Sequence, residues 1–228
     1  MLIIKLPKVT STQDFAESIH DMLYEDFIVV AEEQTRARGR YHRFWYSPKG
    51  GLWFTYAKKN YPTEKVPMST IKVSLAIRKV LSEFIDAKIR WPNDIVVNDK
   101  KIAGVLIEAI SLGENSTVFI GVGIDINIKN FPREINATSL FLETGKLYDI
   151  DDIFNKIIEE INKYLNMDNE RSIEEINKYL NIKNRKIILE LKNGEKECIS
   201  LFVDYFGRLV TDCGIYEVEE VLRVREKG

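Results

Sequence analysis

Two kinds of hydrophobic pattern follow one another along this chain, and the change between them lies near Asn184. Before it, short apolar runs typical of strands alternate with segments whose apolar residues recur at helical spacing. After it, only short strand-like runs occur, separated by turn residues. With 228 residues, the chain is long enough for one good-sized domain and a small second one. The pattern therefore predicts a domain of mixed helices and strands over residues 1–183 and a small all-β domain over 184–228.

The same spacing predicts the individual elements. In the first domain, strands are expected over residues 1–6, 27–31, 52–57, 95–97, 102–109 and 118–128. Helices are expected after a start signal at Ser11, over 68–84 and over 150–181. In the second domain, strand-like runs lie at 186–191, 198–205, 209–212 and 218–224. Such a unit fits a five-stranded barrel. The octapeptide EEINKYLN occurs twice, at 159–166 and 174–181, and two copies do not make a repeat array.

The segment from Arg36 to Thr55 gives the strongest functional signal. Four arginines crowd into its first half, and three aromatic residues, Phe44-Trp45-Tyr46, follow at once. Like charges repel one another, and exposed rings lose the benefit of burial, so this composition is unfavourable in a plain connection. The segment makes sense where an anion with a flat apolar part binds. A nucleotide fits that description, and so does nucleic acid.

The overall charge separates these two possibilities. Lysine and arginine number 33 and the acidic residues 35, which gives a formal net charge of −2. A dedicated nucleic-acid-binding protein usually carries a basic surplus, because neutralising phosphates drives its affinity. We therefore expect the arginines to form a local site on a nearly neutral protein, with no nucleic-acid partner.

The cysteines and the first residues of the chain give an indication of the cellular compartment in which the protein works. Cys198 and Cys213 are too few and too widely spaced for a metal knuckle or a redox pair, so they suit a reducing compartment and need no role. The start of the chain lacks the basic leader and apolar run of a signal peptide, and no apolar stretch approaches membrane-spanning length. These features predict a cytoplasmic protein without membrane contact.

A second informative segment is Arg90-Trp91-Pro92-Asn93-Asp94, which a short turn separates from Lys100-Lys101. The residue before a proline is extended, so Asn93 and Asp94 should be displayed at a strand end, with a lysine on the facing arm of a hairpin. A lysine suits a phosphate oxygen whose charge grows during a reaction, and a carboxylate can hold Mg²⁺. A plain hairpin turn with solvated polar residues is the alternative interpretation.

The third segment, Gly121-Val122-Gly123, fails as a dinucleotide-binding fingerprint because the third glycine and the following helix are missing. Glycines inside a strand instead indicate that a ligand or another strand approaches the backbone closely. The sequence GxxxxGK[ST] is absent, which excludes a P-loop. His20 and His42 belong to no catalytic or metal-binding pattern.

Taken in order along the chain, these segments resemble the pattern of biotin protein ligases. The pattern comprises Ser11-Thr12, Gln34, Arg38-Gly39-Arg40 with Trp45, Trp91-Pro92-Asn93-Asp94, Lys101 with Ala103-Gly104, and Gly121-x-Gly123 with Asn127. The resemblance implies an α+β fold, with a mixed sheet and flanking helices as in class II aminoacyl-tRNA synthetases, followed by an SH3-like barrel. Many relatives carry an N-terminal DNA-binding domain. Because the pattern begins at Ser11, the resemblance implies the ligase-only form.

The resemblance also implies an activity. Biotin is activated with ATP to biotinyl-5′-AMP and then transferred to a lysine of a biotin carboxyl carrier protein. Mg²⁺ is the implied metal, and a homodimer is the expected assembly because relatives are often dimers.

Roles carry over residue by residue. The biotin-binding residues implied are Ser11, Thr12, Gln13, Gln34, Arg38, Gly39, Arg40, Lys101 and Gly104. Those implied for ATP and the adenylate are Arg38, Arg40, Trp45, Asn93, Asp94, Lys101 and Asn127. Lys101, at the α-phosphate, and Arg40 are the implied catalytic residues, and Asp94 is the implied Mg²⁺ ligand.

The chain departs from the family pattern at four positions. Gln13 stands where relatives usually have Asn, and Arg90 replaces the usual Lys, which keeps the charge but changes the geometry. Ala37 and His42 stand where Gly is common, so backbone freedom is lost in the arginine segment. None of these changes removes a group that the chemistry needs.

Two classes of alternative remain. A lipoate or octanoate ligase or transferase shares the fold. However, octanoyl transferases use a cysteine nucleophile, whereas both cysteines here lie in the C-terminal domain, and the glycine-rich basic motif usual in lipoate ligases is absent. A non-catalytic module that binds biotin or RNA would use the arginines and rings for backbone and stacking contacts. The acidic balance and the intact pair of Asp94 and Lys101 argue against it.

Overall fold

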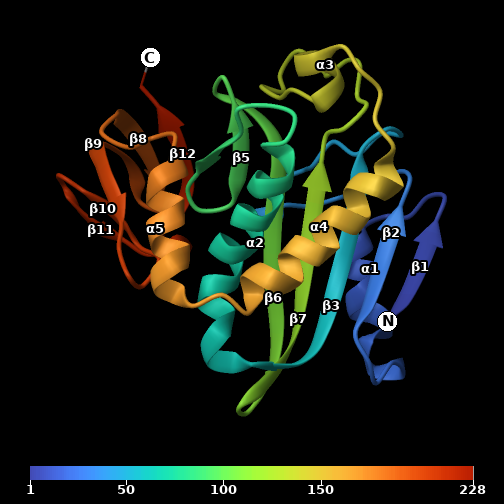
Figure 1. Ribbon diagram of the computed structural model, residues 1–228. Helices are drawn as coiled ribbons and strands as arrows, with labels where there is room; N and C mark the ends of the chain where they lie inside the picture. Colours follow the sequence, from blue (N-terminus) through green and yellow to red (C-terminus); the bar gives the residue numbers. More distant parts are fainter. Residues whose placement is uncertain (228) are drawn as a thin grey trace.

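A computed structural model describes residues 1–227, in which two β-sheets each organise one part of the chain (Figure 1). The larger sheet has seven strands in the order β1-β2-β3-β7-β6-β5-β4. These are β1 (Leu2–Leu6), β2 (Phe27–Ala31), β3 (Leu52–Pro62), β4 (Lys88–Arg90), β5 (Asp94–Val97), β6 (Lys100–Leu112) and β7 (Asn115–Ile124). Strands β1 and β2 run parallel, and every other neighbouring pair in this sheet is antiparallel. The mixed sheet confirms the predicted α+β class, although β7 ends four residues before the predicted strand end.

Helices cover both faces of this sheet, because its strands present apolar side chains on both sides. Helix α1 (Thr12–Ile19) packs on one face against Phe27, Val29 and Phe119. Its start is as predicted, since Ser11 Oγ accepts a hydrogen bond from the Asp14 N–H. Helices α2 (Val66–Leu81) and α4 (Ile150–Leu165) lie together on the other face, which holds the main buried cluster. The short helix α3 (Leu140–Thr144) precedes α4.

The helical region predicted over 150–181 is two helices, α4 and α5 (Asn169–Tyr179). Asp168 caps the start of α5 by accepting from the Arg171 N–H. Each copy of EEINKYLN forms the last turns of one of these helices, and its Ile and Leu are buried both times. The repeat therefore has a packing explanation. Among the helices of the described residues, none combines the length and apolar character that crossing a membrane requires.

The smaller sheet is antiparallel, with the order β11-β10-β9-β8-β12. Its strands are β8 (Lys186–Leu191), β9 (Gly194–Val203), β10 (Leu209–Thr211), β11 (Gly214–Tyr216) and β12 (Val221–Glu226). A five-stranded unit was expected from four strand-like runs, which did not include β11. The strand expected over 218–224 is wrong in its first half. There the chain forms a 3₁₀ turn, η4 (Val218–Glu220), closed by a capping box between Glu217 and Glu220, and β12 follows it.

The two sheets pack together. Buried side chains of both belong to one continuous apolar cluster, and the Trp91 indole N–H donates to the Gly207 carbonyl at 2.9 Å. Helix α5 connects them in the chain and contacts both β4 and β9. The division into domains at residue 184 stays a prediction, because this cluster crosses it.

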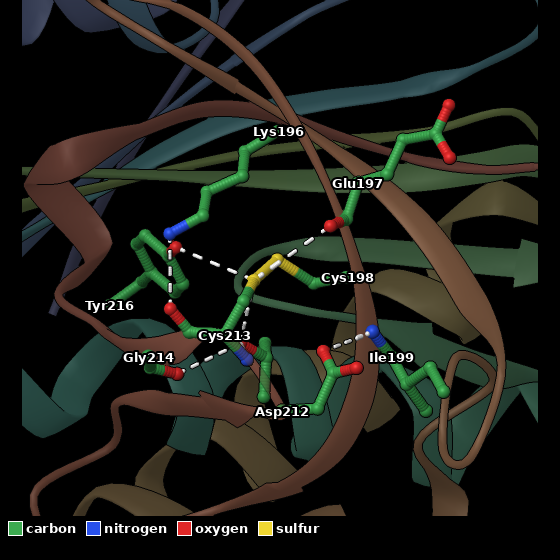
Figure 2. The surroundings of a disulfide bond; sticks show 9 residues. Lys196, Glu197, Cys198, Ile199, Asp212, Cys213, Gly214 and Tyr216 are labelled. Atoms are coloured by element: carbon green, nitrogen blue, oxygen red, sulfur yellow. Dashed lines mark hydrogen bonds between the residues drawn. A yellow bond between two sulfur atoms is a disulfide. The ribbon is translucent and has the colours of Figure 1, made fainter.

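The expectation for the cysteines is wrong. Cys198 on β9 and Cys213 in the turn between β10 and β11 form a disulfide (Figure 2). They are 15 residues apart in sequence, yet antiparallel pairing of β9 with β10 brings their Cα atoms to 5.8 Å. The turn is further tied to β9, because the Lys196 ammonium donates to the Cys213 carbonyl and Asp212 accepts from the Ile199 N–H (Figure 2). The sequence argument for a reducing compartment therefore loses its basis.

Candidate active site

A cavity of about 390 Å³ opens between the larger sheet, the arginine segment and β12. It brings together every residue predicted for the site except Asn127. The predicted residues that line it are Ser11, Thr12, Gln13, Gln34, Arg38, Gly39, Arg40, Trp45, Asn93, Asp94, Lys101 and Gly104. They come from the start of α1, strands β5 and β6, and the segments before β3 and before β5, so only the fold makes them neighbours.

Polar side chains that bond to one another form one wall of the cavity. Gln34 Oε1 accepts from the N–H of Thr12 at 2.8 Å and from its hydroxyl at 3.1 Å, while Gln34 Nε2 donates to Ser47 Oγ. The hydroxyl of Thr55 lies 3.0 Å from that of Thr12 and 3.1 Å from Gln13 Oε1. Thr55 is fully buried on β3, and the sequence analysis missed it because a threonine inside a strand gives no functional signal. The wall offers several oxygens that can accept from a ligand's N–H groups.

The glycines of β7 let side chains of the site approach the sheet. A Cβ at Gly121 would lie 2.6 Å from Gln13 Oε1, and one at Gly123 would lie 2.6 Å from Trp45 Nε1. The predicted close approach to this backbone is thus confirmed, but the approaching groups are the side chains of Gln13 and Trp45 and not the ligand or strand that was expected. At Gly104, a Cβ would lie 3.0 Å from the Lys101 ammonium.

Lys101 is held at the cavity by a carboxylate and a ring. Its Nζ lies 2.5 Å from Asp94 Oδ1 and 4.6 Å from the centre of the Trp45 ring. A two-residue turn with positive φ at Asn98 and Asp99 joins β5 and β6, and this turn sets the two arms of the hairpin in register. The lysine on the facing arm does lie beside Asp94, as predicted.

Asp94 does not fit the role of Mg²⁺ ligand. Its second oxygen, Oδ2, accepts from Arg90 at 3.1 Å, so both oxygens already face a cation. Burial alone would raise the pKa of this carboxyl, but Lys101 and Arg90 outweigh it and hold the pKa below its usual range. Asn93 uses its amide N–H for the Val105 carbonyl. The unusual Arg90 thus acts locally as the second partner of Asp94.

Arg40 extends across the cavity to the smaller sheet. Its Nη2 donates to the carbonyls of Val218 at 2.5 Å and Val221 at 3.1 Å, and its Nη1 lies 3.5 Å from Asn93 Oδ1. The neighbouring Tyr41 hydroxyl donates to the Glu219 carbonyl at 3.0 Å. The turn η4 and the residue after it therefore hold the arginine segment through backbone carbonyls, a contact that no sequence pattern indicated.

The arginine segment adopts a strained backbone next to these contacts. Tyr41 and His42 both have φ of +56°, a region that favours glycine. The replacement at His42, predicted to lose backbone freedom, thus falls where glycine would be least strained. Ala37 shows no positive φ.

Arg38 is bound by three carboxylates. Its Nε donates to Asp14 at 2.8 Å, its Nη1 to Glu108 at 2.7 Å and its Nη2 to Glu17 at 3.3 Å. Burial and the neighbouring Glu108 raise the pKa of Glu17 to about 7. The guanidinium of Arg38 is therefore occupied, and its placement does not support the predicted side-chain contact with a nucleotide. Glu108, the lone charged residue of the apolar run 102–110, is the signal that could have revealed this network.

Two further polar groups line the cavity without partners. Within residues 1–227, neither Asp125 Oδ1 nor Trp45 Nε1 has a hydrogen-bond partner, although both are buried. Burial raises the pKa of Asp125 well above its usual value, only partly opposed by Lys101. A neutral carboxyl offers one donor and one acceptor to a ligand.

Asn127 lies outside the cavity. Its side chain bonds the Tyr148 backbone in both directions, accepting from the N–H and donating to the carbonyl. This is a structural contact, and it does not support the predicted role in binding the adenylate.

Comparisons with known proteins agree with this geometry. The model of the biotin/lipoate A/B protein ligase family matches residues 5–125, which is more than half of the chain. The bifunctional ligase/repressor BirA of Bacillus subtilis is 34% identical over 160 residues, covering 66% of this chain and 49% of that protein. Biotin–protein ligase 1, chloroplastic, of Arabidopsis thaliana is 30% identical over 133 residues, covering 55% of this chain and 36% of that protein. The chain thus spans about half the length of BirA, and less of the plant protein.

Solved structures extend the similarity to the whole chain. The biotin protein ligase of Aquifex aeolicus in complex with biotin and ATP has a TM-score of 0.85 and 25% identity, with 99% of both chains covered. The Leishmania major biotin protein ligase in complex with biotinyl-5-AMP has a TM-score of 0.70 and 28% identity, covering 99% of this chain and 98% of that one. Both parts of the fold, including the small C-terminal sheet, therefore match.

Proposed function

The chain belongs to the biotin/lipoate A/B protein ligase family, and we propose that it is a biotin–protein ligase. It activates biotin with ATP to biotinyl-5′-AMP and transfers the biotinyl group to a lysine of a biotin carboxyl carrier protein. The relatives named above support biotin as the acid in place of lipoate or octanoate. The observation that carries the proposal is the convergence of the predicted residues on one cavity.

In the first step, the carboxylate of biotin attacks the α-phosphorus of ATP. The new bond joins a carboxylate oxygen to phosphorus, and the bond to the bridging oxygen of pyrophosphate breaks. Negative charge on the phosphoryl oxygens increases in the transition state, so a fixed ammonium there lowers the barrier. Lys101 is suited to this role because Asp94 and the Trp45 ring hold its ammonium at the cavity.

In the second step, the neutral amine of the carrier's lysine attacks the acyl carbon and AMP leaves. The mixed anhydride is reactive toward water, so it must be enclosed until the carrier arrives. The arginine segment covers the cavity, and Arg40 is the arginine that can turn toward the intermediate because its present acceptors are neutral carbonyls.

The acid itself is recognised by its ureido ring. Thr12, Gln34 and Gln13 supply acceptor oxygens for the ring N–H groups, and Ser11 lies at the same wall. The side chain of Gln13 is longer than the Asn usual in relatives. It fits at the wall because Gly121 has no side chain to occupy the place of its amide. We expect Mg²⁺ to enter with the phosphates of ATP, since it usually keeps few protein ligands and Asp94 is already paired.

The deciding experiment is ATP–pyrophosphate exchange on the purified chain, with biotin, lipoate and octanoate tested in parallel. We expect exchange with biotin alone. Exchange only with lipoate or octanoate would keep the fold and replace the substrate. No exchange with any acid would replace the enzyme by a binding module, which salt-dependent binding of an oligonucleotide would then test.

The assembly and the location belong to the same proposal. We infer a homodimer in the cytoplasm, which makes contact with the carrier protein and with neither nucleic acid nor membrane. The location rests on the proposed activity alone, since the disulfide removes the support that the cysteines gave to a reducing compartment. Light scattering after size-exclusion chromatography would test the dimer, because a mass of one chain at micromolar concentration contradicts it.

A further inference from the structure

Glu108 on β6 joins two parts of the site that lie far apart in the sequence. Its Oε2 accepts from Gln13 Nε2 at 2.9 Å, and its Oε1 accepts from Arg38 Nη1 at 2.7 Å. Gln13 belongs to α1, and Arg38 belongs to the arginine segment. One carboxylate on the sheet therefore contacts both side chains.

The contact fixes the orientation of the Gln13 amide. An ionised carboxylate only accepts hydrogen bonds, so it must face the amide N–H₂ of Gln13. That N–H₂ also lies 3.3 Å from the Phe119 carbonyl, and the opposite end, Oε1, lies against Gly121 and Thr55 in the cavity wall. Gln13 is only 3% exposed, so it has little freedom to rotate. The carbonyl end is thus presented as an acceptor on the side of the cavity.

The contact also fixes Arg38. Charge-assisted hydrogen bonds are stronger than neutral ones, and this guanidinium makes three of them. Two of the carboxylates, Asp14 and Glu17, lie on α1, and only Glu108 comes from the sheet. Burial alone would raise the pKa of Glu108, but its bonds with Arg38 and Gln13 outweigh this and lower it, so the carboxylate stays ionised.

We propose that Glu108 is a positioning residue, which holds the Gln13 amide as an acceptor for a ligand N–H and fixes Arg38 in the same arrangement. For the ligand half, the inference rests on the proposed function, because a ureido ring supplies the N–H group. Glu108 does not touch the reacting atoms and acts through Gln13 and Arg38.

The test compares three variants in biotin-dependent ATP–pyrophosphate exchange. Glu108→Ala removes both acceptors, and Glu108→Gln keeps one acceptor oxygen without the charge. Glu114→Ala removes an exposed glutamate of the turn between β6 and β7 and serves as the control. In Glu108→Ala we expect the KM for biotin to rise about tenfold or more with kcat changed less than about threefold, because a hydrogen bond to a charged group is lost in binding. Glu108→Gln should recover part of this change. A KM equal to that of the wild type in both Glu108 variants would overturn the inference.

A second readout needs no substrate. Trypsin cleaves after an arginine whose side chain is free to leave its contacts, so we expect cleavage after Arg38 to be several-fold faster in Glu108→Ala, with no change in Glu114→Ala. Glu108→Gln is the variant to use if Glu108→Ala does not fold. Equal cleavage rates in wild type and variant would overturn the positioning of Arg38. Absence of exchange in the wild type would reject the proposed function, and the cleavage result would still decide the role of Glu108.

Discussion

Two neighbouring arginines of the segment from Arg36 to Thr55 are held in opposite ways. Arg38 is bound by three carboxylates of the larger part of the fold. Arg40, two residues later, donates to two backbone carbonyls of the smaller part. Arg38 is therefore fixed by charge, whereas Arg40 is held by neutral acceptors.

This difference shows which arginine can take part in the reaction. A phosphate oxygen is a charged acceptor and forms stronger hydrogen bonds than a backbone carbonyl does. It can therefore take Arg40 from η4 at little cost, whereas removing Arg38 would leave three carboxylates without their cation. We interpret Arg38 as the fixed anchor of the segment and Arg40 as the group that exchanges partners when the adenylate forms.

The largest effect is expected from Lys101→Ala. Lys101 contacts neither Arg38 nor Arg40, and its proposed role is to stabilise charge on the reacting phosphate. We expect exchange to slow by about 10²–10³-fold, the usual effect of losing one group that stabilises transition-state charge, with little change in biotin affinity. Exchange kinetics and calorimetric titration with biotin measure the two quantities. Equal losses in rate and affinity would contradict a role confined to the transition state.

Removing the disulfide tests how the carbonyls of Val218 and Val221 hold Arg40, because β11 leads directly from Cys213 to η4. We expect Cys213→Ser to lower the free energy of unfolding by about 3 kcal/mol, as the loss of a bridge closing a loop of this length predicts. Denaturant titration measures it, and wild type under a reducing agent should match the variant. Trypsin should cleave faster after Arg40 in the variant and at an unchanged rate after Arg38. Faster cleavage after both arginines would mean that the contacts of Arg38 and those of Arg40 are not independent.

Removing the side chain of Arg40 should affect the retention of biotinyl-5′-AMP more than the stability of the fold. In Arg40→Gly we expect biotinyl-5′-AMP to dissociate about tenfold faster, because one charge-assisted hydrogen bond is lost. Arg36→Gly, an exposed arginine in the same segment, is the matched control. Trapping radiolabelled adenylate on a filter measures the release. Unchanged release from Arg40→Gly would show that the segment holds the product through other groups.

The smallest effect is the pH dependence of stability that arises from Glu17, one of the carboxyl groups bound to Arg38. The pKa of Glu17 is about 7 in the folded protein and 4.5 as an unperturbed group, so the folded state binds more protons between these values. The contribution of Glu17 to stability is therefore complete below about pH 4.5 and is lost as the pH rises through 7.

Denaturant titrations at pH 5 and pH 8 would measure this contribution as the difference between wild type and Glu17→Gln. We expect the wild type to lose more stability than the variant on going to pH 8. Because Asp125 and Glu226 also have raised pKa values, the comparison with the variant isolates Glu17. Parallel pH dependence of the two proteins would place the titration elsewhere in the network.

Local sequence signals predicted the parts whose physical cause is local. Residues 27–31 are the observed β2, and the Ser11 start of α1 and the hairpin before Lys101 are also confirmed. Apolar spacing and capping groups act within a few residues, so they can be read from the chain. The break between α4 and α5 was missed because the apolar spacing continues through it and only the Asp168 cap marks the restart.

Contacts between segments far apart in the chain could not be predicted from the sequence, because they depend on which residues folding brings together. The disulfide depends on the pairing of β9 with β10, the hold on Arg40 depends on carbonyl groups that every residue possesses, and Glu108 gains its meaning only beside Gln13 and Arg38. By itself, the sequence determined which chemical groups this protein has and the element on which most of them lie. The tertiary structure alone decided that Arg38 is fixed and Arg40 exchangeable, because the strength of a hydrogen bond depends on the partner that folding brings within reach.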